Sequence, residues 1–465
     1  MILKCLTCGQ EYSLYPPRST CEKCGGSLEY ELGFQQRKVR LSGAARFWKY
    51  RPLLPPVRHT VSLGEGGTPL HKAERLAKQL ALKKLCLKDE TRNPTNSYRD
   101  RAAALLTSNA VDIGAKAMLC ATNGNSGASL AAYCAKAGLA CHVIVPRLVD
   151  VGKLAQMLVY DAAIEEYGET VDDSIRRARK LAEETGWYQA TAELNPLVIE
   201  AQKTISVEVA EQSGVPDWFV VSMGSGGTIY SVWKGFCELR QMGMTSSLPR
   251  MIGVQPDGCA PIVEAYAGKD LKQVKVNHPS TRALAILVGN PLQADLAINA
   301  LRESRGLAIS VSDAEIFAAE LQIAKLEGMF AEPASSATIA ALAKLVEDGT
   351  VAEDESVVCL ITGSGLKATD VLQALTKKQK TVALGLEIST KEKILRMLSE
   401  EDSYGYGLWA KMGRTMTRAA VYQHLNELKS RGLVVAYERD GKRYFRITEG
   451  GRRVLRAMDD LKLLL

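Results

Sequence analysis

The feature that most constrains the fold is a long alternation of two kinds of segment. From about Leu63 to Asp370, short apolar or β-branched runs alternate with amphipathic stretches of helical period. Examples, in chain order, are Lys116–Cys120, Gly127–Ala137, Cys141–Val145 and Val151–Tyr160. This order favours a parallel sheet with helices on both faces. The sequence therefore predicts an α/β core here, in a chain of 465 residues that is long enough for two or three domains.

A glycine-rich loop follows one of the expected strands. Trp218–Ser222 runs directly into Met223–Thr228 (MGSGGT), and a helix is expected from about Ile229. Glycine N–H groups and the positive end of a helix can together hold a phosphate. Such turns also serve close packing alone, so the loop by itself leaves both uses open. Its spacing is neither GxGxxG nor GxxxxGK[ST], which leaves dinucleotide and P-loop interpretations unsupported.

Two CxxC pairs lie close to the start of the chain. Cys5, Cys8, Cys21 and Cys24 form CxxC–x12–CxxC, and glycine follows each pair. Four thiolates from two tight turns suit a structural Zn²⁺ with no position left for water. The alternative is two disulfides or a redox pair, although a second matching pair has no role in a single redox centre. The other seven cysteines are scattered among apolar residues, as expected of small buried side chains in a reducing compartment.

The positive charge is concentrated in the last fifth of the chain. From Lys377 onward there are 19 Lys and Arg against 11 Asp and Glu, a surplus that accounts for the whole net charge of +7. This distribution favours a polyanionic partner for that segment alone. No apolar run approaches the roughly 20 residues of a membrane helix, and the first residues lack a signal-peptide layout. We therefore expect a cytoplasmic protein without a membrane partner.

The basic C-terminal segment has the pattern of a small domain that follows a linker at residues 376–388. Helices are expected from Thr390, over Tyr404–Met412 and from about Thr417. The alternating runs Leu433–Tyr437 and Arg443–Ile447 flank an Asp-Gly pair, which predicts a β-hairpin. Three helices and a basic hairpin make a winged helix-turn-helix domain, here residues 389–465.

This segment resembles PadR-type regulators in AVYQHLNELKSRGLV and GKRYFRITEGGRR. The resemblance implies that the third helix enters the major groove of double-stranded DNA and that the wing contacts phosphates. The candidate DNA contacts are Arg418, Tyr422, Gln423, Lys429, Arg439, Lys442 and Arg443. A winged helix can also serve protein contacts alone. Thr448 is expected to cap a last helix, whose Val454, Leu455, Met458, Leu461 and Leu464 offer a stripe for a homodimer.

A series of motifs before this domain resembles the threonine synthases. They are WKY (48–50), LLP (53–55), SLGEGGTPL (62–70), KDETRNPT (88–95), TNGNSGAS (122–129), GKLAQ (152–156), AEPAS (331–335) and TGSGLK (362–367). These enzymes use pyridoxal phosphate and have the tryptophan synthase β fold, also called fold type II. The resemblance implies a zinc ribbon over residues 1–35 and a two-subdomain parallel-sheet core over residues 36–375.

The resemblance also implies roles for residues that match the family's motifs. Gly224, Ser225, Gly226, Gly227 and Thr228 would hold the cofactor phosphate, Asn125 would contact its phenolic oxygen, and Thr362 would meet its pyridine nitrogen. A neutral partner at that nitrogen suits β- and γ-replacement chemistry.

The sequence departs from the family at the Schiff-base lysine. The family's NPTGSFKDR reads NPTNSYRDR here, so Arg99 stands in the lysine's place, beside Asn96 and Tyr98. Arginine stays protonated, so it can neither bind the cofactor covalently nor act as a base. We therefore expect no catalytic residue, and pyridoxal phosphate only as a non-covalent ligand. An unmatched lysine that reaches the site is the alternative.

Arg99 favours an anionic ligand, since a guanidinium forms paired hydrogen bonds with carboxylate or phosphate. Candidates are free pyridoxal phosphate, that cofactor joined to an amino acid, and phosphohomoserine. The leading hypothesis is a pseudoenzyme that acts as a ligand-responsive DNA-binding transcriptional regulator of amino-acid metabolism. The first alternative is an active threonine synthase with an appended regulatory domain. The second is a silent subunit that stabilises an active paralogue.

Overall fold

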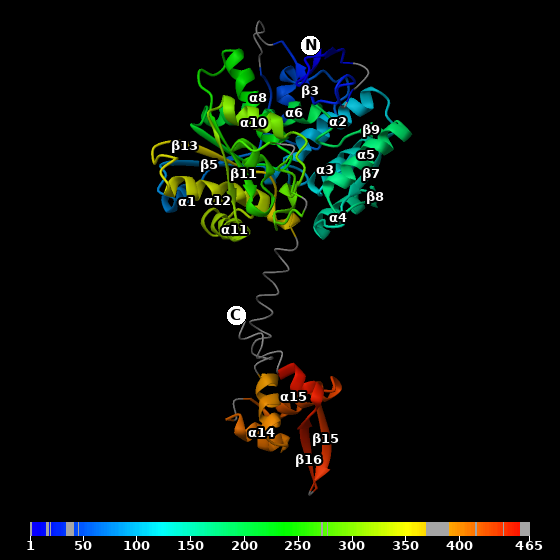
Figure 1. Cartoon of the computed structure of the whole chain (residues 1–465), viewed down its shortest axis with the longest axis vertical. Coiled ribbons are helices and arrows are strands. Elements are labelled where there is room, and N and C mark those ends of the chain that lie inside the picture. The colour runs from blue at the N-terminus through cyan, green and yellow to red at the C-terminus, as the bar shows by residue number, and fades with distance from the viewer. Residues whose placement is uncertain are drawn as a thin grey trace. The chain divides into compact units, whose positions relative to one another are not determined.

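A computed structural model describes most of the chain (Figure 1). The described residues are 2–14, 18, 20–33, 41–44, 46–270, 273–276, 278–368, 390–413, 416–439 and 441–455. The chain divides into two compact units, Met1–Asp370 and Val371–Leu465. The predicted linker at residues 376–388 lies outside the described residues.

The first unit begins with a small antiparallel sheet that carries the two CxxC pairs. Its strands are β1 (Ile2–Cys5), β2 (Glu11–Tyr12) and β3 (Leu28–Glu31), in the order β2-β1-β3. Leu3 and Leu28 are buried because alternate side chains point toward one face. A 3-10 helix, η2 (Phe47–Leu53), then leads into the main core.

The larger sheet of the core has six strands in the order β12-β11-β10-β13-β5-β4. Their bounds are β4 (Leu70–Lys72), β5 (Lys84–Asp89), β10 (Trp218–Ser222), β11 (Arg250–Pro256), β12 (Leu307–Val311) and β13 (Ser356–Ile361). All neighbours are parallel except β4, which pairs antiparallel with β5 at the edge. The predicted parallel sheet is therefore confirmed, with one antiparallel edge strand.

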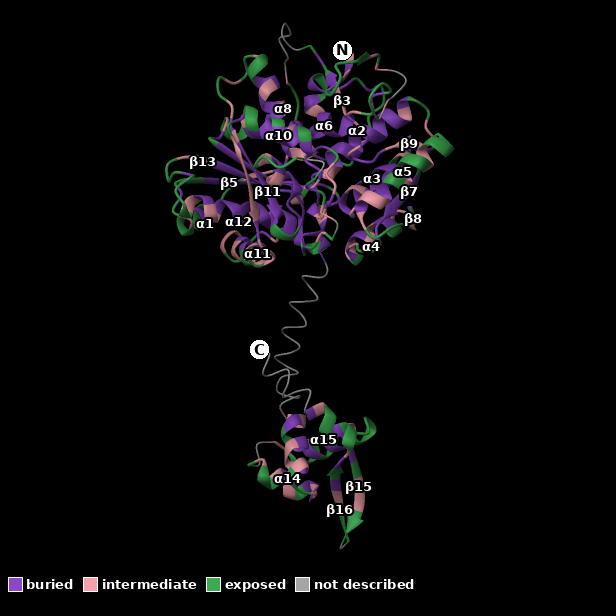
Figure 2. Cartoon of the chain, in the orientation of Figure 1, coloured by how far each residue is buried: buried purple, intermediate pink, exposed green. Residues whose placement is uncertain are grey.

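Helices cover both faces of this sheet (Figure 1). The first face carries α8 (Gly227–Gln241) and α10 (Ala294–Glu303); the second carries α1 (Glu74–Gln79), α11 (Asp313–Glu327) and α12 (Pro333–Glu347). The β10 side chains divide between the two layers, with Phe219 and Val221 in the first and Trp218 and Val220 in the second. A strand buried on both sides is expected to be mostly apolar, and β10 is buried along its whole length and apolar up to its last residue, Ser222. Figure 2 shows buried residues throughout the interior of this unit.

The smaller sheet has four parallel strands in the order β8-β7-β6-β9. Its strands are β6 (Ala117–Ala121), β7 (Ala140–Val145), β8 (Ala163–Glu166) and β9 (Tyr188–Gln189). The helices that precede or follow them in the chain are α2 (Arg99–Asp112), α3 (Asn125–Ala137), α4 (Val151–Val159), α5 (Val171–Thr185), α6 (Leu197–Gln202) and α7 (Thr204–Ser213). Helix α9 (Pro261–Tyr266) instead lies between β11 and β12 and packs against both of these strands of the larger sheet. Two parallel sheets wrapped by helices give the predicted two-subdomain architecture.

The second unit has the predicted winged helix-turn-helix arrangement. It comprises a helix over residues 390–400, β14 (Ser403–Tyr404), α14 (Gly405–Lys411), α15 (Arg418–Ser430), β15 (Val434–Arg439), β16 (Lys442–Ile447) and a helix over residues 449–455. The Thr417 hydroxyl caps α15 by accepting from the Ala420 N–H. Gly441 has φ +67°, as the Asp-Gly hairpin requires. The sequence did not predict β14, which pairs with β16 as a third strand.

The expected dimer stripe is only partly described. Leu455 is buried in the core of its own unit, among residues such as Leu425 and Phe445, so it is not available to a partner and that prediction was wrong. Val454 is half-buried, while Met458, Leu461 and Leu464 lie outside the described residues. Throughout the described part of the chain, we find no helix with the length and apolar character that crossing a membrane requires.

Candidate functional site

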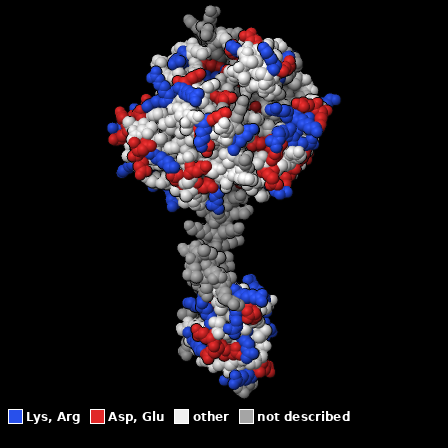
Figure 3. Space-filling view, viewed as in Figure 1, with Lys and Arg blue, Asp and Glu red and all other residues white. Residues whose placement is uncertain are grey.

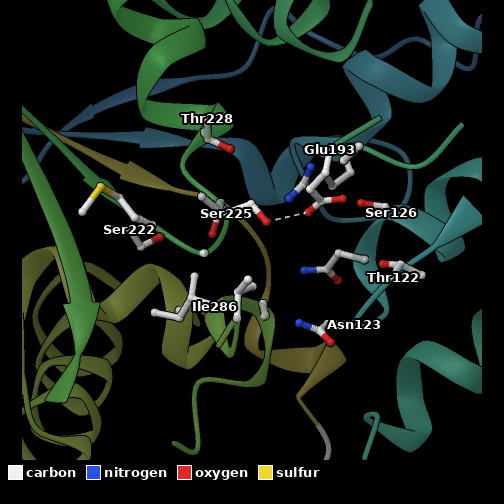
Figure 4. Close-up of a pocket in the computed structure, with 18 of the residues that line it drawn as sticks. Thr122, Asn123, Ser126, Glu193, Ser222, Ser225, Thr228 and Ile286 are labelled. Carbon is white, nitrogen blue, oxygen red and sulfur yellow. Dashed lines mark hydrogen bonds between the residues drawn. The ribbon is translucent and has the colours of Figure 1, made fainter. Parts of the chain in front are cut away.

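A cavity forms where strands from both sheets of the core end. Its wall includes Ala121 at the end of β6, Ser222 at the end of β10 and Thr362 just after β13. Ligands bind at the carboxyl ends of strands in open α/β sheets because the connecting loops leave a crevice there. Figure 4 shows polar side chains from several elements around this cavity. The structure therefore brings together segments that are more than 200 residues apart in sequence.

The predicted phosphate-binding residues and Arg99 lie around this one cavity. The lining includes Arg99, Asn125, Gly224, Ser225, Gly226, Gly227, Thr228 and Thr362. These are all of the ligand-binding residues expected from the sequence.

The glycine-rich loop, Met223–Thr228, packs closely against Gln293. Gly226 has φ +102°, and a Cβ there would lie 2.6 Å from the Gln293 carbonyl oxygen. A Cβ on Gly227 would lie 2.2 Å from Gln293 Oε1. Gly227 is also the first residue of α8, so the loop runs directly into a helix N-terminus, two residues earlier than the sequence suggested. Unpaired N–H groups at such an end attract anions.

Tyr98 connects this loop to the start of α2. Its hydroxyl lies 2.9 Å from Thr228 Oγ1, and burial raises the pKa of the phenol. The next residue, Arg99, is the first residue of α2 and lines the cavity. Its guanidinium carbon lies 4.7 Å from the centre of the Tyr98 ring. No ion pair to Arg99 occurs among the residues that the structure describes.

A buried polar network forms another part of the wall. The Asn125 amide donates to both Glu332 carboxylate oxygens, at 3.1 and 2.9 Å. The Thr362 hydroxyl lies 2.9 Å from Ser335 Oγ and donates to Glu332 at 3.2 Å. Asn125 Oδ1 is buried without a hydrogen-bond partner in the described chain. An orphaned buried acceptor of this kind indicates a missing donor, which a bound molecule can supply.

These features fit pyridoxal phosphate. The glycine-rich loop is a cradle that side chains would fill, and it presents N–H donors suited to a phosphate. Thr362 offers a neutral hydroxyl, and Asn125 offers an amide with an unused oxygen. The donor set therefore matches a phosphorylated aromatic ligand with polar ring substituents.

Sequence reasoning did not identify Glu193 and Gln202 as lining residues. Glu193 follows β9 and accepts a hydrogen bond from the Ser225 hydroxyl at 2.9 Å (Figure 4). Gln202 ends α6, and its Nε2 is buried without a partner in the described chain. Neither residue stands in a glycine-rich or otherwise distinctive motif, so no local signal could have identified them.

Three buried lysines lie close to the matched motifs, but none lines the described cavity. Lys88 donates to Glu208 at 2.8 Å. Lys153 donates to Asp150 at 2.6 Å, and its Nζ lies 3.7 Å from a carboxylate oxygen of the cavity residue Glu332. Lys367 donates to the Thr95 carbonyl oxygen at 2.7 Å, and burial lowers its pKa to about 8.

The four predicted metal ligands also meet. The sulfur atoms of Cys5, Cys8, Cys21 and Cys24 all lie within 4.8 Å of one another, and none is in a disulfide. Four thiols in such a cluster fit a tetrahedral zinc site.

The seven candidate DNA contacts are all exposed. Arg418, Tyr422, Gln423 and Lys429 lie on α15, while Arg439, Lys442 and Arg443 lie at the tip of the β15–β16 hairpin. Apolar side chains of α15, such as Val421 and Leu425, face the domain core instead. Figure 3 shows Lys and Arg over much of the visible face of this unit, around a small acidic patch.

Sequence comparisons agree with both units. The family described as pyridoxal-phosphate dependent enzyme matches residues 61–363, and the PadR-like family of transcriptional regulators matches residues 394–457. The threonine synthase of Methanosarcina acetivorans is 41% identical over 78% of this chain and 92% of its own length. That of Methanocaldococcus jannaschii is 38% identical over 86% of this chain and its full length.

Solved structures support the fold of the core. Maize serine racemase is 21% identical, with a TM-score of 0.57 over 68% of this chain and 93% of its own. The processed form of threonine deaminase isoform 2 from Solanum lycopersicum is 22% identical, with a TM-score of 0.54 over 64% of this chain and 83% of its own. The fold and the cavity thus have the architecture of pyridoxal-phosphate-dependent proteins of fold type II. Given its curated relatives, the chain belongs to the threonine synthase family and carries a PadR-like domain at its C-terminus.

Proposed function

We propose that this chain is a DNA-binding transcriptional regulator whose threonine synthase-like core binds a small ligand without converting it. The observation that carries the proposal is Arg99, which occupies the position of the Schiff-base lysine and lines the cavity. A guanidinium keeps its proton, so it cannot attack an aldehyde or remove a proton from a substrate.

The surroundings support the loss of covalent chemistry. The described lining of the cavity contains no lysine, and Lys88, Lys153 and Lys367 are held by other partners. A replacement lysine would have to leave these contacts, which for Lys153 include Glu332 of the cavity wall at 3.7 Å.

The cavity retains the means to bind. Residues 224–228 would hold the phosphate of pyridoxal phosphate, with Asn125 and Thr362 beside its ring. When bound to an active enzyme, this cofactor supplies an aldehyde and an electron-accepting ring. Here Arg99 would instead contribute a positive charge to a ligand that stays non-covalent, whether the cofactor itself or an amino-acid metabolite.

The second unit provides the DNA-binding part of the proposed regulator. Its PadR-like domain and exposed basic residues suit double-stranded DNA, with α15 in the major groove. We include in the proposal a structural Zn²⁺ at the four N-terminal cysteines and a homodimer, since paired winged helices match paired half-sites.

The first test compares phosphate release from O-phosphohomoserine, with added pyridoxal phosphate, for the natural protein, Arg99→Lys and Arg99→Gln. We expect no release from the natural protein or the glutamine control. We expect the lysine variant to bind the cofactor covalently, with a new visible absorption band. Turnover by the natural protein would overturn the proposal in favour of an active threonine synthase, the alternative that its curated relatives support.

DNA binding tests the proposed role of the second unit. The full chain should retain duplexes selected from a random-sequence pool, and its affinity should fall steeply with salt, because phosphate contacts release counterions. Lys442→Ala and Arg443→Ala should each reduce the salt slope by about 1. If no duplex is retained at low salt, the silent-subunit alternative takes precedence.

A further inference from the structure

The small N-terminal sheet contacts two helices that form part of the cavity. Its strand β3 packs against α6, and side-chain hydrogen bonds join β3 to α8 (Figure 1). Helix α6 contributes Val198, Ile199 and Gln202 to the lining of the cavity, and α8 begins within the glycine-rich loop. The sheet that carries the four cysteines therefore contacts two elements of the ligand site.

Glu29 on β3 makes the main contact with α8. Its Oε1 accepts a hydrogen bond from the Tyr230 hydroxyl at 2.8 Å and another from the Lys234 ammonium group at 2.6 Å. Lys234 also donates to the Tyr30 carbonyl oxygen at 3.0 Å. The side chains of Glu29 and Lys234 are only 13% and 10% exposed. An ion pair with so little solvent around it is weakly screened, and its hydrogen bonds are charge-assisted.

Tyr230 and Lys234 lie on the first turns of α8, directly after the glycine-rich loop. They are four residues apart and so share one face of the helix. The Tyr230 N–H donates to the Gly226 carbonyl oxygen at 3.5 Å, which closes the first turn onto the loop itself. Glu29 therefore holds the part of α8 whose unpaired N–H groups point toward a bound phosphate.

Helix α6 belongs to the same network of charges. Lys234 Nζ lies 3.4 Å from a carboxylate oxygen of Glu200, which is fully buried on α6. Glu200 also accepts from Lys203 at 2.5 Å. Removing one member of a buried charge network leaves the others uncompensated. A displacement of Glu29 would therefore affect α6 and α8 together.

The position of Glu29 depends in turn on the cysteine cluster. Cys5 is opposite Leu28 in the β1–β3 pair, and Lys4 is opposite Glu29. Cys24 precedes Glu29 by five residues in the chain. Segments below about 40 residues rarely have enough core to fold alone, and a metal often supplies the missing stability. A metal ion held by the four thiols would thus fix β3 and, with it, the Glu29 carboxylate.

We propose that Glu29 is a positioning residue for the glycine-rich loop, so that metal at the four cysteines raises the affinity of the loop for an anion. The metal fixes β3, Glu29 fixes the start of α8, and the ordered loop binds its ligand at a smaller entropic cost. This inference rests on the proposed function, because the anion is the ligand of the proposed regulator. It gives that regulator a second input, since metal content changes ligand affinity.

Amide hydrogen exchange of the full chain, followed by mass spectrometry, tests the positioning without any ligand. We expect removal of zinc by a chelator to speed exchange of the amides of residues 230–238 in α8 by about fivefold or more. Glu29→Gln should speed the same amides while zinc stays bound. Unchanged exchange in this variant, or a chain that binds no zinc at the four cysteines, would overturn the inference.

Glu31→Gln is the matched control. Glu31 lies two residues further along β3, is exposed, and pairs with Lys4 at 3.0 Å. The same substitution there should leave exchange in α8 unchanged. Tyr230→Phe removes one of the two donors to Glu29 and should have a smaller effect than Glu29→Gln, in the same direction. Equal effects of the two glutamine variants would show that Glu29 has no special role.

Titration with pyridoxal phosphate tests the coupling. The zinc-loaded chain should bind this probe at least about fivefold more tightly than the zinc-free chain, and the probe should raise the affinity for zinc by the same factor. Zinc-loaded Glu29→Gln should bind the probe as weakly as the zinc-free natural chain, whereas Glu31→Gln should bind it normally. If the zinc-free chain does not stay folded, the two zinc-loaded variants decide the question. Equal affinities in these two variants would contradict the proposal.

Failure of this inference is distinguishable from failure of the proposed function. If pyridoxal phosphate does not bind, inorganic phosphate takes its place as the anion in the same titrations. If the natural protein releases phosphate from O-phosphohomoserine, the regulator proposal is wrong, whereas a response of α8 to zinc and to Glu29→Gln still supports the positioning role. If α8 does not respond and no phosphate is released, the regulator proposal stands and the role of Glu29 is wrong.

Discussion

Two arginines on the first turn of α2 have different roles because they have different partners. Arg101 is fully buried and pairs with Glu90 at 2.7 Å and Glu208 at 2.6 Å. Burial opposes ionisation of Glu208, but Arg101 outweighs it and holds the pKa of that carboxyl below its usual value. Arg99, two residues earlier, has no such carboxylate in the described chain and faces the cavity. One guanidinium therefore fixes the helix while the other is available to a ligand.

We expect Arg101→Gln to destabilise the first unit by about 3–5 kcal/mol, because removing one partner leaves buried carboxylates uncompensated. The midpoint of urea unfolding, followed by circular dichroism, measures this. Lys83→Gln is the matched control, since the Lys83–Glu353 pair at 3.6 Å is largely exposed and should contribute under about 1 kcal/mol. Similar midpoints for both variants would contradict the argument.

Glu320 on α11 gives a prediction about pH. Both of its carboxylate oxygens are buried without a hydrogen-bond partner in the described chain, and burial, then Glu332, raises its pKa to about 7. A carboxyl whose pKa is higher in the folded state costs stability as pH rises from about 4.5 to 7, because folding then opposes its ionisation.

We therefore expect Glu320→Gln to leave the melting temperature nearly unchanged at pH 4.5 and to raise it at pH 8. The gain should be on the order of 2 kcal/mol in unfolding free energy. Melting curves of the natural and variant proteins across this pH range measure the difference. A constant difference at all pH values would show that the effect is one of packing.

At the scale of secondary-structure elements, the sequence predicted those features that depend only on residues close together in the chain. The run from Trp218 to Thr228 predicted a buried strand, a glycine turn and a helix, and all three are present. Thr417 and the Asp-Gly turn correctly indicated a helix start and a hairpin. By contrast, β14 is two residues long and forms only because β16 lies beside it. Glu193 likewise lines the cavity only because of the tertiary fold, and its neighbours in the sequence do not indicate this position.

We expect Gly226→Ala to weaken pyridoxal phosphate binding at least tenfold, because its Cβ would clash with the Gln293 carbonyl oxygen at 2.6 Å. Gly243→Ala is the control: φ there is +69°, but nothing lies within 4 Å of the added Cβ. Both variants should lose about 1 kcal/mol of stability from left-handed backbone strain, and Gly226→Ala should lose more because of the clash. Only the first should lose affinity, as measured by titration with the cofactor. Equal losses of cofactor affinity in the two variants would show that backbone strain, and not the clash, weakens binding.

At the scale of the molecule, the two units each have their own core, and a regulator needs them to be energetically coupled. If the ligand changes DNA affinity by some factor, DNA must change ligand affinity by the same factor, because both paths reach the same ternary complex. Coupling of this kind is typically about 5- to 150-fold. A ligand that lowers the affinity for DNA acts as an inducer, and one that raises it acts as a corepressor.

This reciprocity gives a test that needs four dissociation constants from the full chain. Pyridoxal phosphate and a selected duplex are each titrated with and without the other. The two ratios should agree and differ from 1 by about fivefold or more. Arg99→Gln should leave the affinity for DNA unchanged when no ligand is present, because Arg99 lies in the first unit. The same variant should remove the effect of the ligand on DNA affinity, because Arg99 acts only by binding the ligand. Lys442→Ala should show the converse, with weaker DNA binding and unchanged binding of pyridoxal phosphate alone. A ratio of 1 in both directions would leave two independent binding proteins on one chain, because coupling is the property that makes a binding pocket regulatory.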